Sequence, residues 1–138
     1  MRSPFWQNLW LFWILVIITA TTLPWTSFHA YPTNWQRINW VPYAYTSFLK
    51  IGFRDVLQNI LLYIPFGYFY VKRFPIENRS LLLSVAMFAS ALSISTEVAQ
   101  VFQPLRFPSA TDVINNIFGA LLGANFGRWR SRQKNPIG

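Results

Sequence analysis

Three of the four acidic residues in this sequence lie in or beside long apolar segments, and these are Asp55, Glu97 and Asp112. An ionisable side chain within a membrane span costs about 2.5–3.5 kcal/mol on insertion scales, so such residues are functional candidates. Each acid has amide side chains three or four residues away, a spacing that places both groups on one helix face. The amide partners are, in chain order, Gln58 and Asn59, then Gln100, then Asn115 and Asn116.

Arg106 lies between Glu97 and Asp112 and is their expected counter-ion, because a guanidinium can hold a carboxylate through two parallel hydrogen bonds. Arg106 could instead hold a ligand's phosphate or carboxylate, and a carboxylate could act as a general base. Carboxylate and amide oxygens could also hold Mg²⁺ or Ca²⁺. We commit to a ligand-binding or structural polar cluster, without cofactor or resident metal, made of Asp55, Asn59, Glu97, Gln100, Arg106, Asp112, Asn115 and Asn116.

The sequence has no cysteine and a single histidine, His29, which excludes several kinds of site. Cysteine-ligated zinc, iron–sulfur clusters, disulfides and histidine-rich metal sites are all ruled out. Ser109 and Thr111 have no histidine near them in sequence, so no nucleophile–base pair is visible. Whether the protein is an enzyme stays open, and the sequence favours a function without catalysis.

The composition indicates an integral membrane protein. Of 138 residues, 53% are hydrophobic and only 12% are charged, whereas soluble domains carry about 25% charged residues. The formal net charge is +8, but the Lys and Arg residues lie mostly between apolar segments. That placement favours membrane topology and anionic lipid headgroups over nucleic acid as the reason for the charge.

The apolar segments predict an all-α fold, a bundle of four transmembrane helices. We expect spans over residues 9–23, extended back to residue 5, and over 55–71, 81–102 and 110–126. The first segment could be a signal peptide, but bulky Phe28 makes a poor cleavage site, so a retained helix is favoured. We expect one domain over residues 1–128, and a basic, disordered cytoplasmic tail over 129–138.

Counting Lys and Arg on each side predicts the orientation. Eight lie on the side of the termini and four on the opposite side. The positive-inside rule then places both termini in the cytoplasm. The aromatic-rich connection over residues 25–54 would face outward, and the three acids would lie toward that outward face. In the last span, glycines every four residues predict close helix packing within the bundle or in a homo-oligomer, and these are Gly119, Gly123 and Gly127.

Several motifs together resemble the VanZ-like family of small bacterial membrane proteins. The matching pieces are the segment from Arg54 to Gly67, the E-x-x-Q of Glu97 and Gln100, then Arg106, and the D-x-x-x-N-x-x-G that begins at Asp112. They cover residues 54–123 in the family's order. The resemblance implies a role at the cell envelope, since the family's namesake is associated with low-level resistance to the glycopeptide antibiotic teicoplanin. It implies no particular reaction.

Three hypotheses about function remain. The polar cluster could be a structural network in a membrane protein without catalysis. It could bind or chemically modify a lipid-linked envelope component on the outward face, in a glycopeptide response. The protein could also be an accessory subunit of a larger membrane complex, with the glycine stripe and aromatic surface as docking faces.

Overall fold

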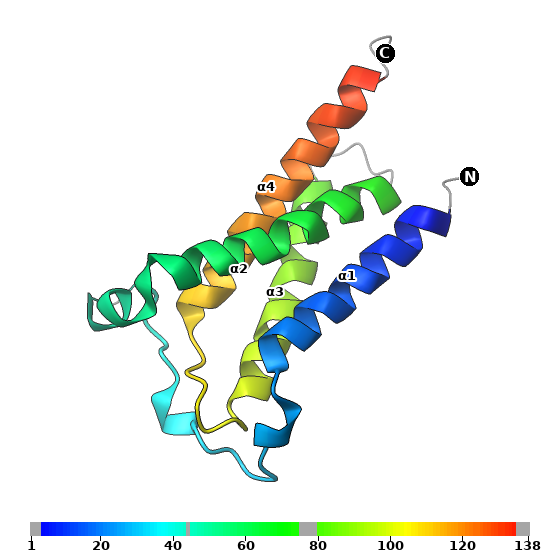
Figure 1. Cartoon of the computed structure of the whole chain (residues 1–138). Helices are drawn as coiled ribbons and strands as arrows, with labels where there is room; N and C mark the ends of the chain where they lie inside the picture. The colour runs from blue at the N-terminus through cyan, green and yellow to red at the C-terminus, as the bar shows by residue number, and fades with distance from the viewer. Residues whose placement is uncertain (1–3, 44, 75–79, 135–138) are drawn as a thin grey trace.

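The computed structural model describes residues 4–43, 45–74 and 80–134, and the predicted all-α fold is confirmed over these residues. The four helices are α1 (Pro4–Thr22), α2 (Tyr45–Arg73), α3 (Ser80–Gln100) and α4 (Ala110–Lys134). Two single-turn 3₁₀ helices, Trp25–Ser27 and Trp35–Arg37, lie between α1 and α2. Figure 1 shows the connection between α1 and α2 beside the turn between α3 and α4, at the end of the bundle that we call the loop end.

Two helices are longer than predicted. α2 begins at Tyr45, so Asp55 lies within the helix rather than at its start. Lys and Arg interrupt the apolar run at positions 50 and 54, yet both are good helix formers and no proline lies between residues 43 and 64.

The prediction of a disordered tail is also wrong for residues 129–134, because α4 continues to Lys134. This segment contains neither Gly nor Pro, and cationic side chains are favourable near a helix C-terminus. Arg2, Arg79 and residues 135–138, which entered the orientation count or the tail prediction, lie outside the described residues.

α2 and α4 pack so closely that their backbones meet at glycines. A Cβ added to Gly123 would overlap the carbonyl oxygen of Ile64, and a Cβ at Gly119 would overlap a backbone oxygen of α2. Gly67 of α2 faces the backbone of α4 in the same way. Gly127 has more room, since the nearest atoms to its added Cβ are 3.4 Å away. The glycine stripe of α4 therefore lies against α2 of the same chain.

The interior of the bundle changes character along its length. Toward the chain termini it is aromatic and aliphatic, with buried Trp10, Phe66, Tyr70, Leu81 and Val85. Toward the loop end the buried side chains are polar, and they include Ser93, Thr96, Gln100, Gln103, Thr111 and Asn116. Buried polar groups need partners, so this end can hold a site that depends on hydrogen bonds.

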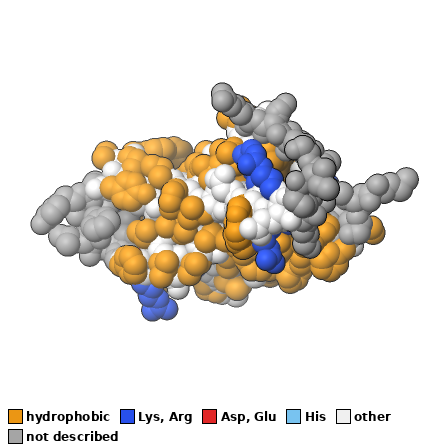
Figure 2. Space-filling model, turned by 90° about the horizontal axis from the view of Figure 1, so that it is seen from above, with side chains coloured by type: hydrophobic (Ala, Val, Ile, Leu, Met, Phe, Trp, Pro, Cys, Tyr) orange, Lys and Arg blue, Asp and Glu red, His pale blue; other side chains and the backbone are white. Residues whose placement is uncertain are grey.

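Large apolar side chains face away from the bundle. On α4 they recur every four residues, at Ile114, Phe118, Leu122 and Phe126, while Ala120 on the inner face is fully buried. Figure 2 shows hydrophobic side chains over much of the described surface on the face in view. A helix of a soluble protein has the opposite pattern, with apolar residues inside and polar residues outside. By length and composition two of the described helices, α1 and α3, could each cross a membrane.

Candidate functional site

The connection between α1 and α2 is fastened to the turn between α3 and α4. Asn34 is only 2% exposed, and its side-chain amide donates hydrogen bonds to the carbonyl oxygens of Gln103 and Arg106. Further along, the backbone of Asn39 exchanges hydrogen bonds of 2.9 and 3.0 Å with residues 108–110. These bonds hold two loops that are far apart in sequence side by side at the loop end.

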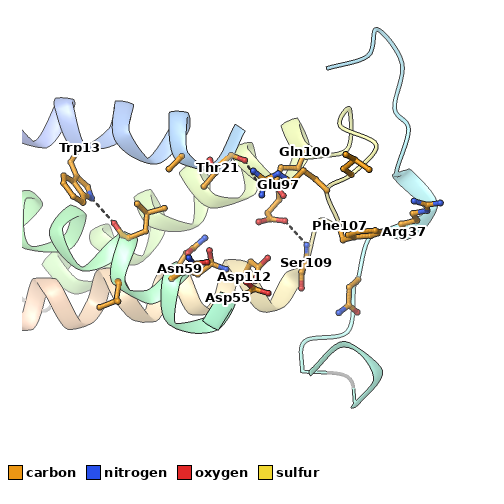
Figure 3. Close-up of a pocket in the computed structure, with 18 residues that line it drawn as sticks. Trp13, Thr21, Arg37, Asp55, Asn59, Glu97, Gln100, Phe107, Ser109 and Asp112 are labelled. Atoms are coloured by element: carbon orange, nitrogen blue, oxygen red, sulfur yellow. Dashed lines mark hydrogen bonds between the residues drawn. The ribbon is translucent and has the colours of Figure 1, made fainter. Parts of the chain in front are cut away.

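A cavity of about 1020 Å³ lies between these loops and the four helices. All four helices contribute to its walls, and so do both loops. Ten of its eighteen lining residues are labelled in Figure 3. The full lining consists of Trp13, Ala20, Thr21, Arg37, Asn39, Asp55, Gln58, Asn59, Leu61, Leu62, Glu97, Gln100, Leu105, Arg106, Phe107, Ser109, Asp112 and Asn116.

Polarity changes along this pocket. Figure 3 shows Trp13 at one end, Arg37 and Phe107 at the other, and Glu97 and Asp112 between them. The indole N–H of Trp13 donates a 2.9 Å hydrogen bond to the carbonyl oxygen of Leu62, which joins α1 to α2 at the inner end. The pocket is therefore amphipathic, with an apolar inner end in the bundle and polar groups toward the loop end.

Glu97 links the end of α3 to the start of α4. Its carboxylate accepts a 2.8 Å hydrogen bond from the backbone N–H of Ser109, which immediately precedes α4. A backbone N–H at a helix start has no partner within the helix, so a carboxylate is well suited to it. Glu97 thus bonds the start of α4 and also lines the pocket.

Asp112 lies in the first turn of α4 and faces α2. Asp55 acts on it as a neighbouring like charge, and the amide of Asn59 lies beside its carboxylate. One carboxylate oxygen, Oδ1, is buried without a hydrogen-bond partner among the described residues. This leaves Asp112 with unused capacity to accept a hydrogen bond.

The predicted amide partners separate in the structure. Gln100 lines the pocket and donates a 3.0 Å hydrogen bond to the carbonyl oxygen of Thr21, and Asn116 lines it and donates a 2.9 Å hydrogen bond to the hydroxyl of Ser93. Asn115 does not line the pocket. Its side-chain oxygen instead accepts a 2.7 Å hydrogen bond from the Tyr43 hydroxyl, so it fastens the loop to α4.

Arg106 does not form the ion pair that the sequence predicted. It lines the pocket, and it is close enough for its charge to act on Glu97. Its guanidinium, however, donates a 2.7 Å hydrogen bond to the carbonyl oxygen of Leu23, after α1. Within the described ranges no ion pair joins Arg106 to Glu97 or Asp112. Carbonyl oxygens at the end of a helix lack a partner within the helix, so the carbonyl of Leu23 can accept this hydrogen bond from the guanidinium.

Sequence reasoning missed several pocket residues. Arg37 and Asn39 come from the connection before α2, and nothing in their spacing relates them to residues 97–116. The guanidinium of Arg37 lies 5.8 Å above the ring of Phe107, a cation–π arrangement at the loop end. Trp13 was not among the predicted site residues. The polar residues between the first two spans were a signal for a role of this connection, but their spacing does not indicate which residues they contact.

The geometry supports binding by hydrogen-bond acceptors. In the part of the chain that the structure describes, the three carboxylates do not converge on a group that could hold a metal ion. His29 lies outside the pocket, where its ring contacts the carbonyl of Ser27. The pocket instead offers carboxylate and amide oxygens beside an apolar wall, which suits a ligand with polar and apolar parts.

Comparison with known proteins identifies the family. The family model described as VanZ/LLP1 matches residues 8–130, a range that includes the whole pocket. No curated protein and no solved structure matches the chain. The match confirms the resemblance seen in the motifs and extends it to the first helix and the connection after it. Since the match covers most of the sequence, the chain belongs to the VanZ/LLP1 family.

Proposed function

We propose that this protein spans a bacterial plasma membrane four times and binds the headgroup of a lipid-linked envelope component in its pocket. The loop end would face outward and both termini would lie in the cytoplasm. Binding there would connect the protein to the response of the cell envelope to glycopeptide antibiotics, as the family resemblance implies. The bilayer, the envelope ligand and a second copy or other membrane subunit are the proposed partners.

The exposed side chains support four spans. α1 has 19 residues and α3 has 21, so each is about 30 Å long, the thickness of the hydrocarbon core. α2 and α4 are longer and carry more polar residues, and five of these polar residues line the pocket: Asp55, Gln58, Asn59, Asp112 and Asn116. The outer faces of α2 and α4 carry exposed Leu57, Phe118 and Leu122, as lipid contact requires.

The charges support the orientation. Lys72 and Arg73 end α2, and exposed Arg130 and Arg132 lie in the last turns of α4, at the end of the bundle away from the pocket. Lys and Arg concentrate on the cytoplasmic side of membrane proteins. This arrangement leaves the pocket on the outward side, where envelope components are exposed.

The observation that carries the proposal is the amphipathic pocket itself. Its volume of about 1020 Å³ is enough for a drug-sized molecule, for which pockets of about 300–1,000 Å³ are usual. Carboxylates and amides lie at the level of the loop end, and Trp13 and Leu62 lie deeper. A ligand with a polar head at the membrane surface and an apolar chain toward the bilayer centre fits this order.

Glu97→Gln tests the proposal sharply, because a glutamine oxygen can still accept the hydrogen bond from Ser109 while the charge is removed. Wild type, Glu97→Gln and Glu97→Ala would be produced in a bacterial host. Glycopeptide sensitivity and the profile of lipid-linked precursors would be measured at equal membrane abundance. A binding site predicts that both variants lose the wild-type effect while Glu97→Gln keeps normal abundance.

The alternatives give different results. If Glu97→Gln behaves as wild type and only Glu97→Ala fails, with reduced abundance, the carboxylate is structural and the binding proposal is wrong. If both variants behave as wild type and a stoichiometric protein co-purifies in mild detergent, the accessory-subunit hypothesis is the better one. Ser95→Ala is a matched control, since Ser95 is exposed on α3 close to Glu97 and outside the pocket lining.

A further inference from the structure

We propose that the headgroup bound in this pocket is a primary ammonium group attached to an apolar chain without an intervening phosphate. This inference rests on the proposed function, because it names the chemistry of the ligand for the same pocket. It is carried by two unpartnered acceptor atoms in the pocket wall and by the order of charges along the pocket.

The buried pocket-wall atoms that have no hydrogen-bond partner among the described residues are two acceptors. Asn116 is 2% exposed and lines the pocket, and its side-chain oxygen has no hydrogen-bond partner among the described residues. Oδ1 of Asp112 is buried and unpartnered in the same way. These two atoms come from successive turns of α4, and Asp55 adds a third side chain that can only accept hydrogen bonds when ionised.

Three donors of the pocket wall are bonded to other parts of the protein. The amide nitrogen of Gln100 bonds the carbonyl of Thr21, and the guanidinium of Arg106 bonds the carbonyl of Leu23. The amide nitrogen of Asn116 bonds Ser93 on α3. A ligand group that enters among the acceptors must therefore supply the hydrogen atoms, and leaving buried acceptors without them is costly.

Charge favours an ammonium over a neutral donor or a phosphate. Three carboxylates lie between the apolar inner end and Arg37 at the loop end. A phosphate that joined an apolar chain to a sugar would place its own acceptor oxygens against the unpartnered acceptors of Asp112 and Asn116. An ammonium beside these acceptors donates three hydrogen bonds and compensates the buried negative charge.

The test compares three amphiphiles with the same chain: dodecylamine, dodecyl phosphate and dodecyl glucoside. The full chain would be placed in phosphatidylcholine nanodiscs, and the thermal unfolding midpoint would be followed as each amphiphile is added. Ligands that bind only the folded state raise the midpoint in proportion to their affinity. Ethanolamine, which has the ammonium without the chain, distinguishes a soluble amine from a lipid-borne one.

We expect dodecylamine to raise the midpoint of wild type and of Ser95→Ala, with little effect of the other compounds. Asp112→Asn and Glu97→Gln should each weaken the apparent affinity for dodecylamine at least tenfold. Two variants are needed because either one alone could fail to fold.

Other results would overturn the inference in distinct ways. If dodecyl phosphate or dodecyl glucoside gives the larger shift, the ammonium assignment is wrong while amphiphile binding stands. If ethanolamine acts as strongly as dodecylamine, the ligand is a soluble amine and the apolar chain is wrong. If dodecylamine shifts the midpoint of both carboxylate variants as much as that of wild type, it binds outside this pocket and the inference is wrong. If no amphiphile shifts wild type, the inference is wrong, whereas the proposed function is decided separately by the Glu97 variants in cells.

Discussion

Replacing Gly123 by alanine should separate α2 from α4 and destabilise the bundle. The added Cβ would overlap the carbonyl oxygen of Ile64, 2.8 Å from its carbonyl carbon and 3.0 Å from the backbone nitrogen of Tyr68. Carbon atoms in ordinary contact are about 3.5–4.0 Å apart, so the two backbones must move by about 1 Å. No flexible side chain can absorb the movement, because all three atoms belong to the backbone.

The expected magnitude combines two opposing effects. Overpacking costs about 1–3 kcal/mol, and a backbone clash should lie at the upper end of this range. Alanine stabilises a helix by about 1 kcal/mol relative to glycine. The net loss in free energy of unfolding is therefore about 2 kcal/mol, roughly 30-fold in the folded-to-unfolded ratio.

Gly127→Ala is the matched control on the same helix. The nearest atoms to its added Cβ are 3.4 Å away and include the side chain of Tyr68, so it fits without movement of the backbone. This variant should be neutral or more stable by up to about 1 kcal/mol. Both variants would be unfolded in mixed micelles with increasing SDS, with tryptophan fluorescence as the readout. Equal stability of the two variants would refute the close approach of α2 and α4 described above.

Two further predictions concern the loops. Asn34→Ala should lower the free energy of unfolding by about 2 kcal/mol, because the carbonyl oxygens of Gln103 and Arg106 lose their buried donor, and thermal unfolding against Asn34→Asp measures it. Single cysteines test orientation in a chain that has none: a cysteine in place of exposed Trp35 should react with a membrane-impermeant maleimide in whole cells, and one in place of Gln133 only after permeabilisation. The reverse labelling would overturn the proposed topology.

The sequence predicts the helices well because each apolar segment is long and bounded by charge or proline. The predicted start of α2 and the predicted end of α4 were both wrong, and one physical reason explains both. Hydropathy measures where a helix can meet lipid, whereas the helix itself ends where backbone hydrogen bonding ends. Lys50 and Arg54 lie outside the apolar segment but inside α2. Residues 129–134 likewise lie outside the apolar segment but inside α4.

The pocket was predictable only where helix periodicity applies. Glu97, Gln100, Asp112 and Asn116 share helix faces at fixed spacing, and the structure brings them to one cavity. Partners across loops follow no period, and they depend on which carbonyl oxygens lie free nearby. The predicted ion pair of Arg106 was wrong for this reason, because its guanidinium donates a hydrogen bond to the carbonyl oxygen of Leu23, just after α1. Whether these residues bind a ligand stays a prediction.

The glycine stripe and the pocket can be explained as two consequences of one helix pair. At Gly67, Gly119 and Gly123 the backbones of α2 and α4 meet, which fixes the distance between the two helices there. Toward the loop end, α2 carries Asp55 and Asn59, and α4 carries Asp112 and Asn116, where the small residues give way to polar ones. These polar side chains line the pocket between the same two helices. A change that separates the glycines should therefore alter ligand affinity as well as stability, although no glycine of the stripe lines the pocket.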